Sequence, residues 1–259
     1  MQVWYTYTVE NSFSMNIISS IFLGFLQGLT EFLPVSSSGH LILVQSLIPG
    51  FSQPGVLFDV FLHFGTFFAV VVFFWKEIIK LPLKYYLYLV LGTIPAAFIG
   101  YFFQSQLEVL FTSTKLVGFA LLVTGVANLL TDGIKSRGKK LSFKNSFITG
   151  VFQAIAIIPG VSRSGTTIFA SVAQGVDKKS AAKFSFLLSI PAVLGANILE
   201  FTTHGLNEIE NYTFYLTGFV FSFASGLLAI YLVFKFLTQR KFKIFAYYCF
   251  FLGILAILL

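Results

Sequence analysis

The chain has 259 residues, of which 56% are hydrophobic and 10% are charged, with a mean hydropathy of +0.86 and a net charge of +7. Soluble domains carry about 25% charged residues, so this composition excludes an ordinary soluble enzyme and predicts a protein embedded in a membrane. The positive charge then indicates cytoplasmic loops that orient the chain, and we expect no nucleic-acid partner.

In chain order, the first segment is 1–14, which holds no lysine or arginine and so does not resemble a secretory signal. Met15 offers an alternative start, which would make 1–14 an extra N-terminal segment. After it, six apolar segments reach or approach the roughly 20 residues that a spanning helix needs. They are 56–75, 85–103, 116–130, 184–201, 214–234 and 242–259.

Two further apolar stretches, 17–33 and 147–158, run into polar motifs and continue as pieces too short to cross a membrane alone. Each motif is therefore predicted to be the tip of a re-entrant hairpin, in which one half-helix enters the membrane and the next leaves it. Non-helical backbone at this depth is tolerated only when it is buried in protein or lines a wet cavity. Proline and glycine break the helices where the tips require it, at Pro34, Gly39, Pro159, Gly160 and Gly165.

The two motifs also belong to an internal repeat. Six positions recur with the same residue type 126 residues later: Gly24, Gln27, Val35, Ser36, Ser38 and Gly39 match Gly150, Gln153, Val161, Ser162, Ser164 and Gly165. One hairpin and three spans give each half three crossings, so the second half has the opposite orientation. We expect an all-α polytopic membrane protein, one domain over 1–259, built as an inverted-topology repeat with halves at about 15–133 and 141–259.

The basic residues test this topology. With the N-terminus outside, 15 of the 17 lysines and arginines fall on inner loops, while Lys115 alone falls outside and Arg163 lies in the second motif. This asymmetry agrees with the positive-inside rule. Inverted repeats place their binding sites where broken helices meet, with helix N-termini pointing at anions. The topology therefore predicts an anion site within the membrane.

Arg163 is the most informative polar residue. It could simply reach the membrane surface or pair with a carboxylate, but hydroxyl and glycine residues surround it. Arginine binds phosphate oxygens in a bidentate manner, and glycine lets backbone N–H groups approach an oxyanion. We therefore favour a phosphate or diphosphate site, to which the neighbouring residues Ser162, Ser164, Gly165 and Thr167 contribute donors.

Glu31 is the second candidate. In one interpretation it only pairs with Arg163 across the repeat interface, and in the other it is a general base or a ligand of the divalent cation that accompanies a diphosphate. Gln27 lies four residues earlier on the same helix face, and Gln153 is its counterpart in the repeat. Both glutamines offer neutral oxygen ligands or hydrogen bonds.

The third group is Ser36, Ser37, Ser38 and His40. One or two of these serines are expected to be helix N-caps, while a serine or histidine nucleophile next to a base is chemically reasonable. His40 could attack phosphorus, act as an acid or bind phosphate as a cation, and these roles stay open. Asp59 and His63, four residues apart, either face the site or form a structural pair, and His204 is expected in a solvated outer loop.

With these motifs in order along this hydropathy pattern, the chain resembles the undecaprenyl-diphosphate phosphatase family of the bacitracin-resistance type. The motifs that carry the resemblance are 27–40 and 159–168, supported by 58–66 and 184–191. It implies a multi-pass enzyme of the bacterial cytoplasmic membrane, dependent on Mg²⁺ or Ca²⁺, with an active site that opens to the outer side. Its activity would convert a polyprenyl diphosphate to the monophosphate, recycling the carrier lipid for peptidoglycan synthesis and giving bacitracin resistance.

Residue by residue, the resemblance implies catalytic roles for Glu31, Ser37, His40 and Arg163. The expected substrate-binding residues are Ser36, Ser38, Gly39, Gly160, Ser162, Ser164, Gly165, Thr167 and Gln153, and the expected metal ligands are Glu31 and Gln27. Many members have glutamate where this chain has Gln27, which puts a two-carboxylate metal site in doubt. His63 is the other departure, since glutamine is frequent there.

Two rival functions are also compatible with the sequence. Inverted repeats with broken helices are typical of alternating access, so a transporter or flippase of polyprenyl phosphate is the main alternative. The other class of lipid phosphatases, with a basic signature and paired histidines, fits poorly because His40 and His204 lack that spacing. A homodimer is compatible with either function.

Overall fold

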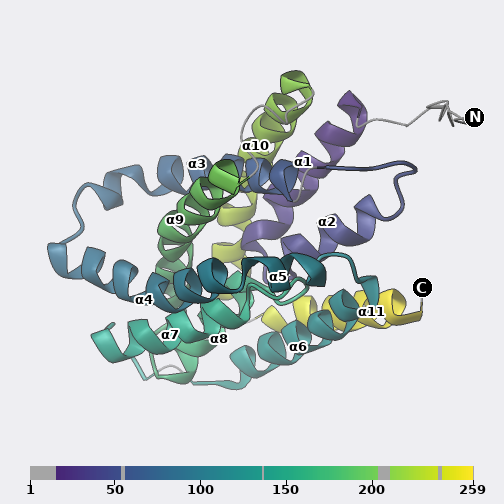
Figure 1. Cartoon of the computed structure of the whole chain (residues 1–259). Coiled ribbons are helices and arrows are strands. Elements are labelled where there is room, and N and C mark those ends of the chain that lie inside the picture. Colours follow the sequence, from purple (N-terminus) through teal and green to yellow (C-terminus); the bar gives the residue numbers. More distant parts are fainter. Residues whose placement is uncertain (1–15, 54–55, 136, 204–210, 239–240, 259) are drawn as a thin grey trace, which may run out of the picture.

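The computed structural model describes residues 16–53, 56–135, 137–203, 211–238 and 241–258 (Figure 1). The extra segment 1–14, Met15 and His204 lie outside these residues. The described chain folds into eleven helices and contains no strand, only an isolated bridge between Lys139 and Val176. The prediction of an all-α protein with several membrane-spanning helices is confirmed for the described residues.

Five of the helices are long and apolar enough to cross a membrane. They are α3 (Leu57–Ile78), α4 (Leu83–Phe102), α6 (Thr114–Gly133), α9 (Lys178–Thr203) and α10 (Tyr212–Thr238). The sixth predicted span corresponds to α11 (Phe242–Leu258), which is apolar but has only 17 residues. A short helix, α5 (Gln104–Leu110), connects α4 to α6.

The two polar motifs interrupt helices as the sequence predicts. The first separates α1 (Ile17–Phe32) from α2 (Ser37–Gln45), and the second separates α7 (Phe143–Ile155) from α8 (Arg163–Ala173). None of these four helices is long enough to be a candidate span. Backbone with positive φ occurs in both breaks, at Ser36 (70°) and Gly160 (94°). This conformation is unusual for a residue other than glycine, so Ser36 is held in it by its surroundings.

The helix boundaries repeat with the same spacing as the sequence. Helices α1 and α7 begin at residues 126 apart, and Ser36 and Ser162, also 126 apart, are the N-caps of α2 and α8. Their packing partners correspond as well, because α1 packs against α10 while α7 packs against α4. The first helix of each motif therefore packs on a helix from the other half of the chain.

Glycine pairs make these exchanged contacts close. A Cβ added to Gly24 would lie 2.3 Å from the carbonyl oxygen of Gly218, and one added to Gly150 would lie 2.4 Å from that of Gly92. The partners Gly92 and Gly218 are themselves 126 residues apart. Small residues allow helix backbones to approach in this way in membranes, where van der Waals packing is a main attraction between helices.

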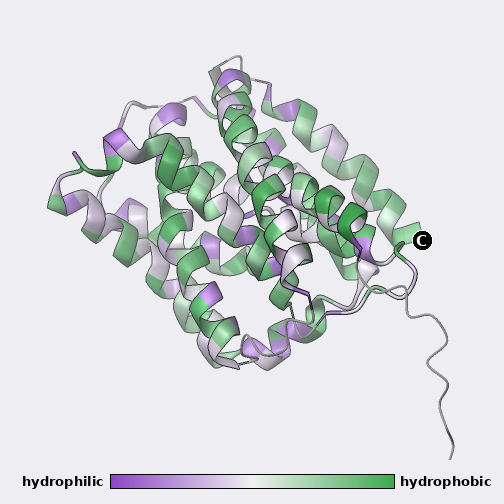
Figure 2. Cartoon of the chain, turned by 90° about the horizontal axis from the view of Figure 1, so that it is seen from above, coloured by the Kyte–Doolittle hydropathy of each residue, from purple (hydrophilic) through white to green (hydrophobic). Residues whose placement is uncertain are grey.

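The surface is apolar, unlike that of a soluble protein, and buried polar residues lie beside the hydrophobic core. Hydrophobic residues make up most of the helices, and hydrophilic ones gather in loops, at helix ends and near the centre (Figure 2). Val72, Phe98 and Phe251 are each more than half exposed, whereas Gln27 and Asn128 are fully buried. An apolar surface of this extent requires lipid around it, and the buried polar centre marks the functional site.

Candidate active site

The tips of the two motifs meet inside the molecule. Nη2 of Arg163, at the start of α8, donates a hydrogen bond of 2.5 Å to Oε1 of Glu31, near the end of α1. The backbones are equally close, because a Cβ added to Gly39 would lie 3.1 Å from Cα of Gly160. The glutamate-bearing and arginine-bearing loops therefore touch, although 132 residues separate the two side chains.

The same local hydrogen bonds form each tip. Oγ of Ser36 accepts from the N–H of Gly39 at 3.3 Å and lies 3.4 Å from Oγ of Ser38. In the second motif, Oγ of Ser162 accepts from the N–H of Gly165 at 3.1 Å and lies 3.2 Å from Oγ of Ser164. Ser36 and Ser162 thus cap their helices, and this accounts for the pattern of serines that both motifs share.

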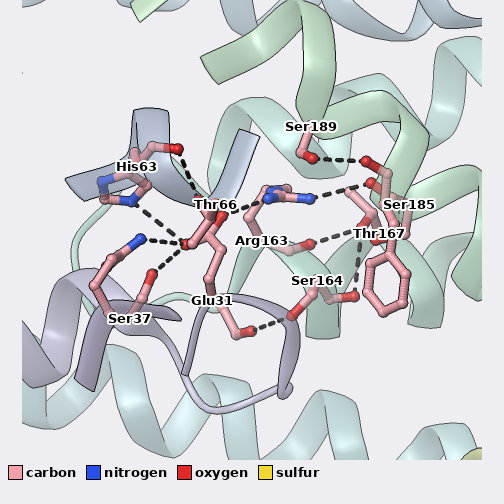
Figure 3. A network of polar contacts seen from close by, with 12 residues as sticks. Glu31, Ser37, His63, Thr66, Arg163, Ser164, Thr167, Ser185 and Ser189 are labelled. Carbon is pink, nitrogen blue, oxygen red and sulfur yellow. Dashed lines mark hydrogen bonds and ion pairs between the residues drawn. The ribbon is translucent and has the colours of Figure 1, made fainter. Parts of the chain in front are cut away.

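Both oxygens of the Glu31 carboxylate are engaged (Figure 3). Oε2 accepts hydrogen bonds from the hydroxyl of Ser37 at 2.6 Å and from the amide of Gln27 at 3.0 Å, and it lies 3.4 Å from Nε2 of His63. With Arg163 on Oε1, four side chains from four helices converge on one carboxylate. Glu31 is only 6% exposed, and a buried charge is maintained only when it is paired and hydrogen-bonded in this way.

Arg163 is fixed from the other side by α9. Its Nη1 donates to the carbonyl oxygen of Ser185 at 3.1 Å. Thr167, one turn further along α8, donates to the carbonyl oxygen of Arg163 at 2.7 Å and lies 2.6 Å from Oγ of Ser185. The guanidinium group therefore keeps a defined orientation, with 15% of its side chain exposed.

A cavity of about 280 Å³ opens onto this network. Its polar end contains Glu31, Ser36, Ser37, Ser38, His63, Ser162 and Arg163. The remaining walls are mostly apolar, and they come from α3, α5, α9 and the segment after α7, at Val56, Val60, Leu107, Phe111, Ile157, Val193, Ala196 and Leu199. Three carboxylates also line it, at Asp59, Glu108 and Glu200. A polar end that contains the guanidinium group of Arg163, next to mostly apolar walls, suits an amphiphile with an anionic head.

Several predicted substrate-binding residues do not line this cavity but contact the residues that do. Ser164 donates to the carbonyl oxygen of Leu33, and Gly165 packs against Pro34, so both lock the second tip onto the first. Thr167 holds Arg163 as described above. Gln153 lies elsewhere, because its amide donates to the carbonyl oxygen of Gly92 on α4 at 3.3 Å.

The two histidines of the region have different surroundings. Nδ1 of His40 lies 2.6 Å from the carbonyl oxygen of Ser36, and its Nε2 lies 2.6 Å from the hydroxyl of Tyr248 on α11. Both ring nitrogens are thus occupied, and His40 is not part of the cavity wall. His63 does line the cavity, and its Nδ1 lies 2.7 Å from the carbonyl oxygen of Asp59. The spacing of four between Asp59 and His63 was the signal in the sequence for this placement.

The residues that could hold a divalent cation are Glu31 and Gln27. Oε1 of Gln27 is buried and has no hydrogen-bond partner, and the Gln27 amide group lies one helical turn from the carboxylate. Such an orphaned oxygen next to a carboxylate fits a hard cation. Within the described part of the chain, no cluster of three or more histidine, cysteine, aspartate or glutamate residues offers another metal site.

Comparison with known proteins agrees with the motifs. The family model described as "Bacitracin resistance protein BacA" matches residues 20–255. A protein of Halothermothrix orenii named undecaprenyl-diphosphatase is 43% identical over 256 residues, which cover 95% of this chain and 98% of that protein. Proteins of the same name from Methanococcus maripaludis and Thermosipho africanus are 43% and 41% identical, over 90% and 92% of this chain and 96% and 98% of their own lengths. The resemblance seen in the sequence is therefore confirmed, and the chain belongs to the BacA family of bacitracin resistance proteins.

Proposed function

We infer that this chain is an undecaprenyl-diphosphatase: it hydrolyses undecaprenyl diphosphate to undecaprenyl phosphate and inorganic phosphate. The observation that carries this function is the Arg163–Glu31 contact at the polar end of a cavity whose other walls are mostly apolar. The names of the similar proteins state the same activity. Returning the carrier lipid to peptidoglycan synthesis in this way accounts for bacitracin resistance.

The diphosphate competes with Glu31 for Arg163. A guanidinium group binds phosphate oxygens with two parallel hydrogen bonds, and the serine hydroxyls at the tips add neutral donors. The isoprenoid chain lies along the apolar wall and leads into the lipid. When Arg163 turns to the phosphate, Glu31 loses its counter-charge and is free to accept a proton.

Ser37 is the best placed nucleophile. Its hydroxyl already donates to Glu31, so Oγ can attack the distal phosphorus as its proton passes to the carboxylate. The bond from that phosphorus to the bridging oxygen breaks, and undecaprenyl phosphate leaves. Glu31 passes this proton to the leaving phosphate and is ionised again. It then takes a proton from the water that releases inorganic phosphate from Ser37, and returns that proton to Oγ of Ser37. Positioning and charge stabilisation supply most of the catalysis in phosphoryl transfers. In this site Arg163 would provide the stabilising charge.

A divalent cation, Mg²⁺ or Ca²⁺, belongs to this proposal. Glu31 and Gln27 would hold it, and it would add positive charge beside the diphosphate when bound. The buried, unpartnered Oε1 of Gln27 supports this assignment.

The proposed architecture is an inverted-topology repeat in the bacterial cytoplasmic membrane, with α1–α2 and α7–α8 as re-entrant hairpins. The matching caps and the exchanged helix contacts support the repeat. The distribution of lysine and arginine supports an N-terminus on the outer side. In this orientation the active-site cavity opens outward, because it lies between the start of α3 and the end of α9.

The other side of the site is closed by aromatic residues, which favours an enzyme over a transporter. Phe186 contacts Phe32 at a ring-centroid distance of 5.3 Å and Phe234 at 5.7 Å, and Phe74 lies 6.1 Å from Phe234. Phe32 follows Glu31, and Phe186 follows the Ser185 carbonyl that binds Arg163. We call these four residues the aromatic layer. Movement of a lipid phosphate through the protein would require the whole layer to open.

Phosphate release in detergent tests the function directly. Purified protein without a membrane gradient should release inorganic phosphate from undecaprenyl diphosphate, and Arg163→Ala should abolish this release while the protein stays folded. The hydrolase assignment fails if the folded wild type releases no phosphate but moves labelled undecaprenyl phosphate across vesicles.

A further inference from the structure

A second cavity lies at the opposite end of α3 and α9. It measures about 400 Å³ and is lined by Phe73, Phe74, Glu77, Lys179, Ser180, Lys183, Tyr231 and Phe234. These residues come from the end of α3, the start of α9 and the last third of α10. In the proposed orientation this end of the molecule faces the cytoplasm, so we call this cavity the inner cavity.

The repeat explains why the inner cavity exists and why it is not a second active site. Residues 126 apart place Phe74 in the position of Glu200, and Phe234 in the position of Glu108. Both glutamates line the active-site cavity, and both phenylalanines line the inner one. The inner cavity is therefore the counterpart of the substrate cavity, in which aromatic rings of the aromatic layer replace carboxylates and close the way to Arg163.

The charges that remain in the inner cavity are mainly positive. Lys183 forms an ion pair with Glu77, which joins α9 to α3. Lys179, one turn earlier on α9, is exposed, and its ammonium group makes no ion pair among the residues that the structure describes. Two lysines and one glutamate give the cavity a net charge of about +1, which complements one phosphate diester. The hydroxyls of Ser180 and Tyr231 add neutral donors beside it.

The cavity is also continuous with the lipid-facing surface. Phe73 is 40% exposed and Tyr231 is 58% exposed, and both belong to the cavity wall. Tyrosine rings such as that of Tyr231 settle at the level of lipid headgroups, while the apolar ring of Phe73 suits contact with an acyl chain. Basic pockets between spanning helices on the cytoplasmic side bind anionic headgroups. A soluble phosphate would use only the lysines, whereas a phospholipid would use the lysines and the aromatic walls together.

We propose that the inner cavity is a binding site for one anionic phospholipid of the inner leaflet. Lys179 contacts the phosphate, Ser180 and Tyr231 donate to the headgroup, and an acyl chain lies over Phe73. Glu77 weakens the site, because it neutralises Lys183. This site is separate from hydrolysis of the substrate at Arg163.

Native mass spectrometry of protein extracted from bilayers with equal amounts of phosphatidylglycerol and phosphatidylcholine tests this site. The wild type should retain phosphatidylglycerol preferentially. Since a lysine near the surface contributes about 1 kcal/mol to the binding of anionic lipid, Lys179→Ala should retain about fivefold less. Lys179→Arg should restore retention, and Glu77→Gln should raise it by freeing Lys183.

Lys140→Ala is the matched control, because Lys140 is an exposed lysine outside the cavity. It should retain phosphatidylglycerol like the wild type. The proposal is overturned if the wild type retains both lipids equally, or if Lys140→Ala reduces retention as much as Lys179→Ala. It is also overturned if undecaprenyl phosphate displaces phosphatidylglycerol from the Lys179-dependent site, since the occupant would then be the carrier lipid.

Discussion

The hydroxyl of Ser37 lies 2.6 Å from the same carboxylate, Glu31, that pairs with Arg163. The proposed nucleophile, the proposed base and the proposed phosphate-binding cation are thereby joined through one side chain. The arrangement is held by four helices, so the geometry does not depend on a flexible loop.

Replacing Ser37 by Ala should lower turnover by at least about 10²-fold, the scale on which a positioned group contributes to proton transfer and attack. Glu31→Gln should have a similar effect, and the double variant should be little worse than either single one, because the two residues act as a unit. With substrate labelled in the distal phosphate, acid-quenched wild type should carry label on Ser37.

Ser38→Ala is the control for this pair, since its hydroxyl contacts only Ser36 among the described hydrogen bonds. It should lower turnover by less than about tenfold. A Ser37→Ala protein that keeps turnover within twofold of the wild type would assign the attack to water, with Glu31 as its base.

Arg163→Lys should lose at least about 10²-fold in turnover even though it keeps the charge. An ammonium group is a point charge and lacks the planar fork that binds Glu31 and the Ser185 carbonyl at once. Arg137→Lys is the matched control, because Arg137 is exposed and lies outside the cavity. Steady-state phosphate release measures both, and a near-wild-type rate for Arg163→Lys would show that charge alone suffices.

The two histidines should respond differently to substitution. His40 joins α2 to α11 through Tyr248, with stacked rings 5.6 Å apart, so His40→Ala and Tyr248→Phe should both lower the thermal stability. The loss for Tyr248→Phe should be about 1 kcal/mol, the net value of one hydrogen bond. His63→Gln should leave the melting temperature unchanged and should change the turnover in phosphate release instead. If folded His40→Gln loses turnover with no loss of stability, His40 is catalytic, as the sequence resemblance implies.

This difference between the histidines shows what the sequence could predict. Hydropathy, the 126-residue repeat and the polar motifs were enough to place Glu31 and Arg163 at two facing tips, because their cost in a membrane requires a partner. The neighbours of His40 were not predictable, since Tyr248 lies 208 residues away in a segment with no polar pattern. Side-chain contacts of this kind depend on how helices are rotated against each other.

The same limit applies to the serines and to Gln153. A run of serines at a helix break is compatible with caps and with catalysis, and only the structure distinguishes Ser36, which caps, from Ser37, which faces Glu31. Gln153 repeats Gln27 in the sequence, but the exchanged helix contacts place it against Gly92 on α4. Repeats conserve local structure more faithfully than they conserve the function of each position.

Gln27→Glu should strengthen binding of Mg²⁺ or Ca²⁺, because it places a second carboxylate one turn from Glu31. Isothermal titration calorimetry of the purified protein with each metal alone measures this without any turnover. Gln106→Glu adds the same charge on the exposed surface of α5, outside the cavity, and should change the metal affinity little. Equal affinities for the wild type, Gln27→Glu and Gln106→Glu would place the cation elsewhere.

The aromatic layer can be tested from the side that the proposed orientation places in the cytoplasm. Phe186 is fully buried and its ring contacts Phe32 and Phe234, so Phe186→Ala should lower the free energy of unfolding by about 3–5 kcal/mol and leave a gap beneath Arg163. A cysteine introduced at Ser189, one turn beyond Ser185 on α9, reports on that gap. In inside-out vesicles a membrane-impermeant thiol reagent should modify Ser189→Cys only when Phe186→Ala is also present.

Phe236→Ala is the control, because it removes a ring from the same core cluster outside the aromatic layer. It should leave Ser189→Cys protected from the reagent. Modification of Ser189→Cys in the otherwise unchanged protein would mean that the layer opens by itself, and the case for transport would then be the stronger one.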